Sequence, residues 1–447
     1  MASSCPLRPG RAVVALAAAA FVVSLAAFAA DTAFHAGLLN WFDLGVYDHA
    51  GLIVRREPAT LYSWRLSPGI KFTYTPFAAL LFAVGSELPV LIRHWLMTVA
   101  SIAALPVVTW LEFGALGWRG RDRTAAALAV AALSLWTEPA LRALQLGQIE
   151  LLLMALIVWD LCQDDRRWWK GAGVGLAAGI KLVPLIFIIY LALCGKLRQA
   201  AATAAAFAVT VAIGFILLPH VSAKWWLTGY FLHPGNVGGV AAPLNQSLLA
   251  LITRALGTAA ATPVWLSAAA LTAALGLGAA ALLHRCGRPV AGWVVCALTG
   301  LLVSPISWDH HWVWVVPVLV VLTDLAVRAS GQARWAYWVL GGAVAGVFGG
   351  WPEDWTGPMA FVPHGLVGFF AGPHPANEIY HLHGIQLISW NLFVVAGLAM
   401  LAVGLAAAAR IAAGRAALTR IRRSSDPHLT YMPPVAPPGN ILAAGRA

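Results

Sequence analysis

The chain carries repeated runs of about twenty apolar residues, the length of helix that crosses a lipid bilayer, and this feature restricts its fold more than any other. The first run covers residues 11–30, and similar runs recur up to residue 409. Of the 447 residues, 60% are hydrophobic and 11% are charged, and so much apolar surface cannot be buried in one water-soluble core. The sequence therefore predicts an all-α polytopic membrane protein and excludes a soluble globular enzyme.

Arginine and lysine residues separate the apolar runs, and the positive-inside rule uses them to assign the cytoplasmic side of the membrane. On this rule both termini are cytoplasmic and the chain crosses the plasma membrane twelve times. The expected spans are 11–30, 91–113, 124–140, 149–162, 169–181, 183–194, 200–218, 264–283, 289–303, 311–327, 335–350 and 385–409. A removed signal peptide is an alternative for the first span, because Ala27-Phe28-Ala29 resembles a cleavage site.

Two segments allow more than one interpretation. Residues 72–88 resemble another span, but that span would place the arginine-rich loop 119–123 outside, so we expect a helix on the outer face. Residues 169–194 resemble one long helix. Because basic clusters flank both of its ends and Lys181 and Pro184 interrupt its middle, two short arms that meet near Lys181 fit better.

This topology divides the chain into three parts. Residues 1–10 are a cytoplasmic N-terminus, residues 11–409 are the membrane domain, and residues 410–447 are a basic, proline-rich, disordered cytoplasmic tail. The long outer loops are 31–71, 219–263 and 351–384. All histidines except His284 and His428 fall on the outer side, so we expect the chemistry to face outward.

The formal net charge of +11 does not indicate a nucleic-acid partner, because the basic residues flank apolar runs and form no patch. The sequence also lacks a Walker loop, a dinucleotide-binding glycine turn and a Cys/His cluster with the spacing of metal ligands. We therefore expect no nucleic acid and no bound metal, although the carboxylates of the first outer loop leave a metal chemically possible.

The first outer loop contains Asp43, Asp48 and His49 shortly after the first span. A carboxylate held among aromatic side chains at a membrane surface is partly desolvated, which raises its pKa and suits a general base. A helix N-cap or a solvated loop acid explains the same spacing, and spacing alone favours that explanation. Tyr74 lies in an aromatic segment typical of the membrane interface.

Charged and aromatic residues between the later spans are harder to explain by structure alone. An unpaired ammonium at Lys181 is costly inside the membrane, so this residue should line a cavity or meet an anion such as phosphate, with snorkelling to the interface as the alternative. The run 304–312 places Asp309, His310 and His311 at the outer surface. One of these histidines is expected to contact a phosphate or a sugar hydroxyl.

Amide side chains open two further segments. Asn245-Gln246-Ser247 precedes a short apolar stretch whose N-terminal amides can bind an anion, and helix capping explains this run equally well. Gln148 and Glu150 begin a span on the outer side and face either a cavity or the interface.

Taken in chain order, several of these segments resemble one family. They are Phe42-Asp43-Leu44-Gly45-Val46-Tyr47, Leu61-Tyr62, Phe72-Thr73-Tyr74-Thr75-Pro76-Phe77, Gly147-Gln148, Gly179-Ile180-Lys181-Leu182-Val183-Pro184, Asn245-Gln246-Ser247 and Ser304-Pro305-Ile306-Ser307-Trp308-Asp309-His310-His311-Trp312. The set is similar to the polyprenyl-phosphate-mannose-dependent mannosyltransferases, glycosyltransferase family 87, over about residues 10 to 410. Thr75-Pro76 departs from the proline pair that the family often has there.

The resemblance implies a GT-C fold with its active site at the outer face. It implies inverting transfer of mannose from polyprenyl phosphate mannose to a glycolipid or lipoglycan of an actinobacterial envelope, commonly in an α-1,2 linkage, with Asp43 as general base and no cofactor. The expected donor-binding residues are Tyr74, Gln148, Lys181, Asn245, Gln246, His310 and His311. Asp48, His49 and Asp309 are expected near the acceptor, on chemistry alone.

Two alternatives come from other classes of protein. A lipid-linked sugar flippase or transporter would use Lys181 and the outer acids as a substrate path, but it needs polar intramembrane residues on both sides, and here they collect on the outer side. A structural scaffold explains neither Lys181 nor the carboxylates of the first outer loop.

Overall fold

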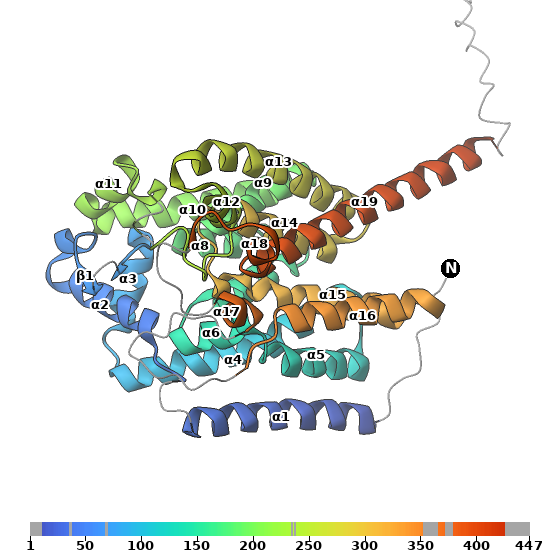
Figure 1. The fold of residues 1–447 in the computed structure, drawn as a ribbon, viewed down its shortest axis with the longest axis horizontal. Coiled ribbons are helices and arrows are strands. Elements are labelled where there is room, and N and C mark those ends of the chain that lie inside the picture. The colour runs from blue at the N-terminus through green and yellow to red at the C-terminus, as the bar shows by residue number, and fades with distance from the viewer. Residues whose placement is uncertain are drawn as a thin grey trace, which may run out of the picture.

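The protein is an all-α assembly of long and short helices with one small β-hairpin (Figure 1). The computed structural model describes residues 11–34, 38–67, 70–233, 236, 238–351, 365–371 and 379–424. Its helices are α1 (Arg11–Phe34), α2 (Phe42–Arg56), α3 (Pro76–Gly85), α4 (Val90–Ala115), α5 (Gly120–Ser134), α6 (Glu138–Leu146), α7 (Glu150–Leu161), α8 (Ala172–Ile180), α9 (Ile186–Leu193), α10 (Leu197–Leu217), α11 (Pro219–Leu227), α12 (Leu248–Leu256), α13 (Thr258–Arg285), α14 (Pro289–Val303), α15 (Val315–Arg328), α16 (Gly331–Val347), α17 (Leu366–Ala371), α18 (Gly384–Ser389) and α19 (Leu392–Ser424). The 3-10 turns are η1 (Pro58–Thr60), η2 (Val183–Leu185), η3 (Tyr230–Leu232) and η5 (Asp309–Trp314), and β1 (Arg65–Ser67) pairs antiparallel with β2 (Ile70–Lys71).

Several helices have the length and apolar composition of membrane spans, which confirms a polytopic membrane protein. Within the described residues six helices meet this criterion, or seven if α6 and α7 count as one bent span. The twelve crossings expected from the sequence are not confirmed, because α5, α8, α9, α14 and α16 have only 8 to 17 residues. A straight helix needs about twenty residues to cross the hydrocarbon core.

The chain between α5 and α7 differs most from the sequence expectation. The helix that covers most of the expected span 124–140 is α5, and it ends at Ser134. The next helix, α6, is separate and makes an angle of 117° with α7. Every residue of α6 is buried, and the helix packs against η5. The polar residues of α6, Glu138, Arg142 and Gln145, have the spacing of one helix face, but this face is buried in the protein and does not meet water.

Two other segments follow the sequence more closely. The chain breaks at Lys181 as expected, because α8 ends at Ile180 and Lys181 itself is extended, with φ −139° and ψ 129°. Residues 72–88 contain only the ten-residue helix α3, which is about 15 Å long and too short to cross the membrane.

The last helix, α19, continues beyond the expected end at residue 409 to Ser424. The rest of the expected tail, 425–447, and much of the loop 351–384 lie outside the described residues.

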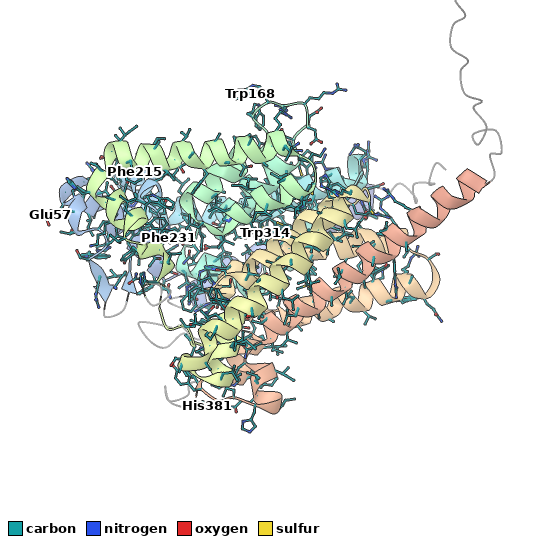
Figure 2. All side chains as sticks on the ribbon, turned by 90° about the horizontal axis from the view of Figure 1, so that it is seen from above. Glu57, Trp168, Phe215, Phe231, Trp314 and His381 are labelled. Atoms are coloured by element: carbon teal, nitrogen blue, oxygen red, sulfur yellow. The ribbon has the colours of Figure 1, made fainter. Side chains whose placement is uncertain are left out.

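The segments that connect the long helices separate into two ends. Figure 1 shows α2, α3, α11 and β1 together at one end, whereas the far end of α19 extends away from them. In Figure 2 Phe215 and Trp168 lie near opposite ends of α10, and Glu57 lies beyond the Phe215 end. Parts of the expected outer loops 31–71 and 219–263, namely α2, β1 and α11, therefore share one end of the molecule, which we call the loop end.

Close packing of α8 on α10 holds the Lys181 break in place. A Cβ atom added at Gly175 would lie 2.3 Å from the backbone oxygen of Thr203, and one at Gly179 would lie 2.3 Å from Thr210 Oγ1. Glycines four residues apart on one helix face let two helices approach closely. This contact orients the end of α8, from which Lys181 projects.

We expect Gly175→Val to destabilise the protein by about 2 kcal/mol or more, because the added side chain must push α8 from α10. The thermal unfolding temperature of the purified protein in detergent measures this effect. Gly278→Val is the matched control, since a Cβ at that helical position meets nothing within 4 Å. Equal unfolding temperatures for the two variants would contradict the packing argument.

Candidate active site

A cavity of about 930 Å³ lies at the loop end. One part of its wall is apolar and includes Trp225, Phe231, Leu249 and Trp265; Figure 2 shows Phe231 on the same side of the molecule as Phe215 and Glu57. The polar side chains of its wall include Asp43, Tyr47, Lys71, Tyr74, Arg142, Gln148, Lys181, Asp309, His310 and His311. The cavity therefore joins a compact polar region to an apolar surface.

Asp43 lies in the first turn of α2 and is held by a hydrogen-bonded network. Gln148 Nε2 donates to Asp43 Oδ2 at 2.5 Å. The other end of that amide, Gln148 Oε1, accepts from the hydroxyl of Tyr47 at 2.5 Å and from that of Tyr74 at 3.1 Å. The two hydroxyls lie 2.6 Å apart. The network fixes the carboxylate while Asp43 remains partly exposed at the cavity wall.

Burial raises the pKa of the Asp43 carboxyl above its ordinary value. The nearby His310 and the hydrogen bond from Gln148 oppose this shift, because both favour the ionised form. The balance leaves Asp43 more basic than a solvated aspartate, as a general base requires. Burial also raises the pKa of Tyr47, so this phenol stays protonated and acts as a donor.

The start of α2 is positioned by backbone contacts to the bend between α6 and α7. Trp41 precedes the helix in the left-handed conformation, with φ 48°. The amides of Asn40 and Trp41 both donate to the carbonyl of Gln145, at 3.1 and 2.8 Å. These contacts place Asp43 beside Gln148, which lies in the bend.

Asp48 and His49 lie on α2 but are not part of the cavity wall. Asp48 Oδ1 accepts from Arg93 Nε at 2.7 Å, and its Oδ2 lies 3.4 Å from His94 Nε2, so Asp48 anchors α2 to α4. His49 is exposed and stacks on Trp64 with ring centroids 5.1 Å apart. The acceptor contacts expected of both residues stay predictions.

Lys181 projects from the break after α8 and meets a carboxylate. Its ammonium bonds to Glu150 Oε1, and it donates to His311 Nε2 at 2.8 Å. Because that ring nitrogen accepts the bond, the proton of a neutral His311 is on Nδ1. Lys181 lines the cavity, and Glu150 already balances its charge. The phosphate contact expected of Lys181 stays a prediction.

Asp309 and His310 form a second buried group in η5. Asp309 Oδ2 lies 3.1 Å from Arg142 Nε, and Asp309 Oδ1 lies 3.2 Å from His310 Nδ1. The other ring nitrogen, His310 Nε2, is buried and has no hydrogen-bond partner among the described residues. Since His310 lines the cavity, this unpartnered nitrogen is a candidate for contact with a ligand.

Glu150, His310 and His311 can also be considered as metal ligands, since their ligand atoms lie within 4.8 Å of one another. The ammonium of Lys181, however, already bonds to Glu150 and His311. A cation therefore already neutralises this carboxylate. The expectation that no metal is bound stays a prediction.

Asn245, Gln246 and Ser247 support the cavity wall from behind and are not part of it. Asn245 Oδ1 accepts from the amide of Ser307 at 2.9 Å, and Gln246 Nε2 donates to the carbonyl of Trp390 at 2.8 Å. The Ser247 hydroxyl accepts from Ala250 N at 3.2 Å and so caps α12. The capping interpretation is confirmed, and the donor contacts expected of Asn245 and Gln246 stay predictions.

Sequence reasoning missed Arg142 and Glu138, which lie on α6 near Asp309. Both side chains are fully buried, and the two carboxylate oxygens of Glu138 have no hydrogen-bond partner among the described residues. Charged residues inside an apolar region are themselves a signal of function. The sequence hides this signal because Glu138 falls inside the expected span 124–140 and Arg142 lies just after it.

Comparison with known proteins shows the family of this chain. Glycosyltransferase family 87 matches residues 72–305. A polyprenol-phosphate-mannose-dependent alpha-(1-2)-phosphatidylinositol pentamannoside mannosyltransferase of Mycobacterium tuberculosis is 34% identical over 76% of this chain and 79% of the relative. A protein of the same description from Mycolicibacterium smegmatis is 32% identical, over 72% and 79%. A polyprenol-phosphate-mannose-dependent alpha-(1-2)-phosphatidylinositol mannoside mannosyltransferase of M. tuberculosis is 30% identical, over 61% and 66%. No solved structure matches the chain.

The fold and cavity define a polytopic membrane protein with a cavity lined by carboxylates, cations and histidines. The extent of these matches identifies it further: the chain belongs to glycosyltransferase family 87, and it is a sugar-transferring enzyme. The family resemblance read from the sequence is confirmed.

We expect Lys181→Met to destabilise the protein by about 3–5 kcal/mol, because it leaves the buried Glu150 carboxylate without its cation. Thermal unfolding in detergent measures the loss. Adding Glu150→Gln to Lys181→Met removes both charges and should restore most of the stability. A single variant as stable as the wild type, or a double variant less stable than the single one, would show that the pair does not hold this region together.

Proposed function

We propose that this enzyme transfers mannose from polyprenyl phosphate mannose to a phosphatidylinositol mannoside, with inversion from a β-linked donor to an α-(1-2)-linked product. The observation that carries the proposal is the position of Asp43, a carboxylate with a raised pKa at the wall of a cavity that also has buried cations and an apolar surface. The names of the relatives support the choice of donor, acceptor and linkage.

In the proposed reaction Asp43 removes the proton from an acceptor hydroxyl as its oxygen attacks the anomeric carbon of the donor. The bond from that carbon to the phosphate oxygen breaks, and its electron pair stays on the phosphate. Inversion requires a base on the face opposite the leaving group and no covalent sugar intermediate. Gln148, Tyr47 and Tyr74 hold the base in position.

The leaving phosphate is stabilised by hydrogen-bond donors and needs no strong acid, because a phosphate is a good leaving group. Lys181 and His310 are the expected contacts. His310 Nε2 is the unpartnered nitrogen at the wall, and it can donate to phosphate as the imidazolium or accept from a sugar hydroxyl as the neutral ring. The apolar wall that includes Trp225 and Phe231 offers a surface for the isoprenoid chain.

We further propose a GT-C fold whose loop end faces the outside of the plasma membrane and whose termini are cytoplasmic. Its support is the charge at the opposite end, where one loop carries Arg166 and Arg167, the next loop carries Lys196, and the first turn of α10 carries Arg198. Cytoplasmic loops are enriched in such residues. The donor sugar would then reach the cavity from the outer leaflet.

We expect Asp43→Asn to reduce mannose transfer by a factor on the order of 100 or more, since the amide cannot accept the proton. The measurement is transfer of labelled mannose from polyprenyl phosphate mannose to phosphatidylinositol mannosides by the purified protein in vesicles. Glu57→Gln, at an exposed position of the same end, is the control and should keep wild-type activity. Full transfer by Asp43→Asn contradicts the role of the base, and transfer from a nucleotide sugar without lipid contradicts the donor.

The pH dependence of transfer tests the network around Asp43. The hydrogen bond from Gln148 lowers the pKa of Asp43, so Gln148→Leu should raise that pKa further. Because the base works only when ionised, the acidic limb of the kcat/KM profile should move to higher pH, by about one unit. Gln163→Leu, away from the cavity, should leave the limb unchanged. A limb that stays in place or moves to lower pH in Gln148→Leu is the contrary result.

A further inference from the structure

We propose that Lys71 binds the phosphate of the lipid-linked donor and supplies the positive charge that the leaving phosphate requires. The inference rests on the proposed function and adds to it a residue and a chemical role. The ligand class is a phosphate ester that carries one negative charge as the donor and two as the released phosphate monoester.

The charges of the cavity wall lead to this inference. Of the lysines and arginines at the wall, Arg142 pairs with Asp309 and Lys181 pairs with Glu150. With neutral histidines these pairs carry no net charge, and the ionised base Asp43 adds a negative one. The donor phosphate carries one negative charge and gains a second as it leaves, and these pairs offer no net positive charge to balance it, so a further cation at the wall would stabilise the leaving group.

Lys71 is that cation. It lines the cavity, and its described polar contact is a hydrogen bond from Nζ to Asn236 Oδ1, a neutral oxygen, at 3.0 Å. Within the described part of the chain no carboxylate pairs with it. An ammonium has three protons to donate, so two remain for phosphate oxygens.

The position of Lys71 is fixed from both sides. It ends the β-hairpin, where Arg65 pairs with Lys71 in register. Its partner Asn236 is held in turn by a bond from Nδ2 to the carbonyl of Tyr230, at 3.2 Å. Three residues after Lys71 the chain reaches Tyr74, whose hydroxyl belongs to the Asp43 network. The same short segment therefore brings a cation and part of the support for the base to one cavity.

A structural cross-link between the hairpin and Asn236 is the competing role for Lys71. The two roles respond differently to substitution. Lys71→Arg keeps the charge, Lys71→Gln removes it, and Asn236→Ala removes the cross-link while it keeps the cation. If Lys71 binds phosphate, loss of the charge matters much more than loss of the cross-link.

The test compares these three variants with the wild type as purified full-length proteins in vesicles. Steady-state transfer is measured against polyprenyl phosphate mannose and, separately, against the phosphatidylinositol mannoside acceptor, together with inhibition by the product polyprenyl phosphate. Thermal unfolding checks that each variant is folded. Lys224→Gln on α11 is the matched control, because this lysine is exposed and lies outside the cavity wall.

We expect Lys71→Gln to lower kcat/KM for the donor by a factor on the order of 100, with the acceptor KM unchanged. Polyprenyl phosphate should inhibit this variant about tenfold more weakly, because the released dianion depends most on the cation. Lys71→Arg should stay within about tenfold of the wild type. Asn236→Ala should lose less than Lys71→Gln, and Lys224→Gln should match the wild type.

Three results would overturn the inference while the proposed function stands. They are wild-type donor kinetics in a folded Lys71→Gln, unchanged product inhibition in that variant, or an equal loss of donor kcat/KM in Asn236→Ala. Wild-type protein that transfers no mannose from the lipid donor would instead refute the proposed function and, with it, this role of Lys71.

Discussion

Inside a membrane every backbone N–H and C=O must find a hydrogen-bond partner, and this requirement governs the structure. Irregular backbone is tolerated at that depth only where it is buried in protein or lines a cavity. The helices are interrupted at 147–149, at 181–182 and at 304–308, and residues from all three interruptions line the same cavity. The side chains placed by these breaks include Gln148 and Lys181. The constraint that limits broken helices thus also concentrates polar groups at one site.

The partners of the broken backbone come from segments far away in the sequence. The carbonyl of Ser307 accepts from the amide of Gln246 at 2.7 Å, and the amide of Asp309 donates to the carbonyl of Leu244 at 2.9 Å. Asn245 therefore supports the loop that precedes Asp309 without lining the cavity. In the same way, the carbonyl of Gln145, beside the bend at Gln148, accepts from the two amides that precede α2. Buried charges follow a related rule, since Lys181 and Asp309 each have a partner of opposite charge.

The sequence predicted the membrane class, the break at Lys181 and most of the polar cavity wall. Asp43, Gln148, Lys181 and His310 could be found because ionisable or amide residues next to apolar runs have few structural explanations. The pairing of Lys181 with Glu150 could not be predicted, because it joins two helices whose relative position is a tertiary property. The count of twelve spans is not confirmed for a similar reason: the short helix α6 buries its polar residues inside the protein, and its place in the fold is a tertiary property.

The configuration of the new glycosidic bond tests the account most directly. Purified protein would be incubated with β-linked polyprenyl phosphate mannose, carbon-13 labelled at the anomeric position, and a phosphatidylinositol mannoside, and the product's anomeric carbon–hydrogen coupling would be measured by NMR. A single base at Asp43 without a covalent intermediate predicts an α-linked product. A β-linked product would show retention of configuration and would contradict the mechanism.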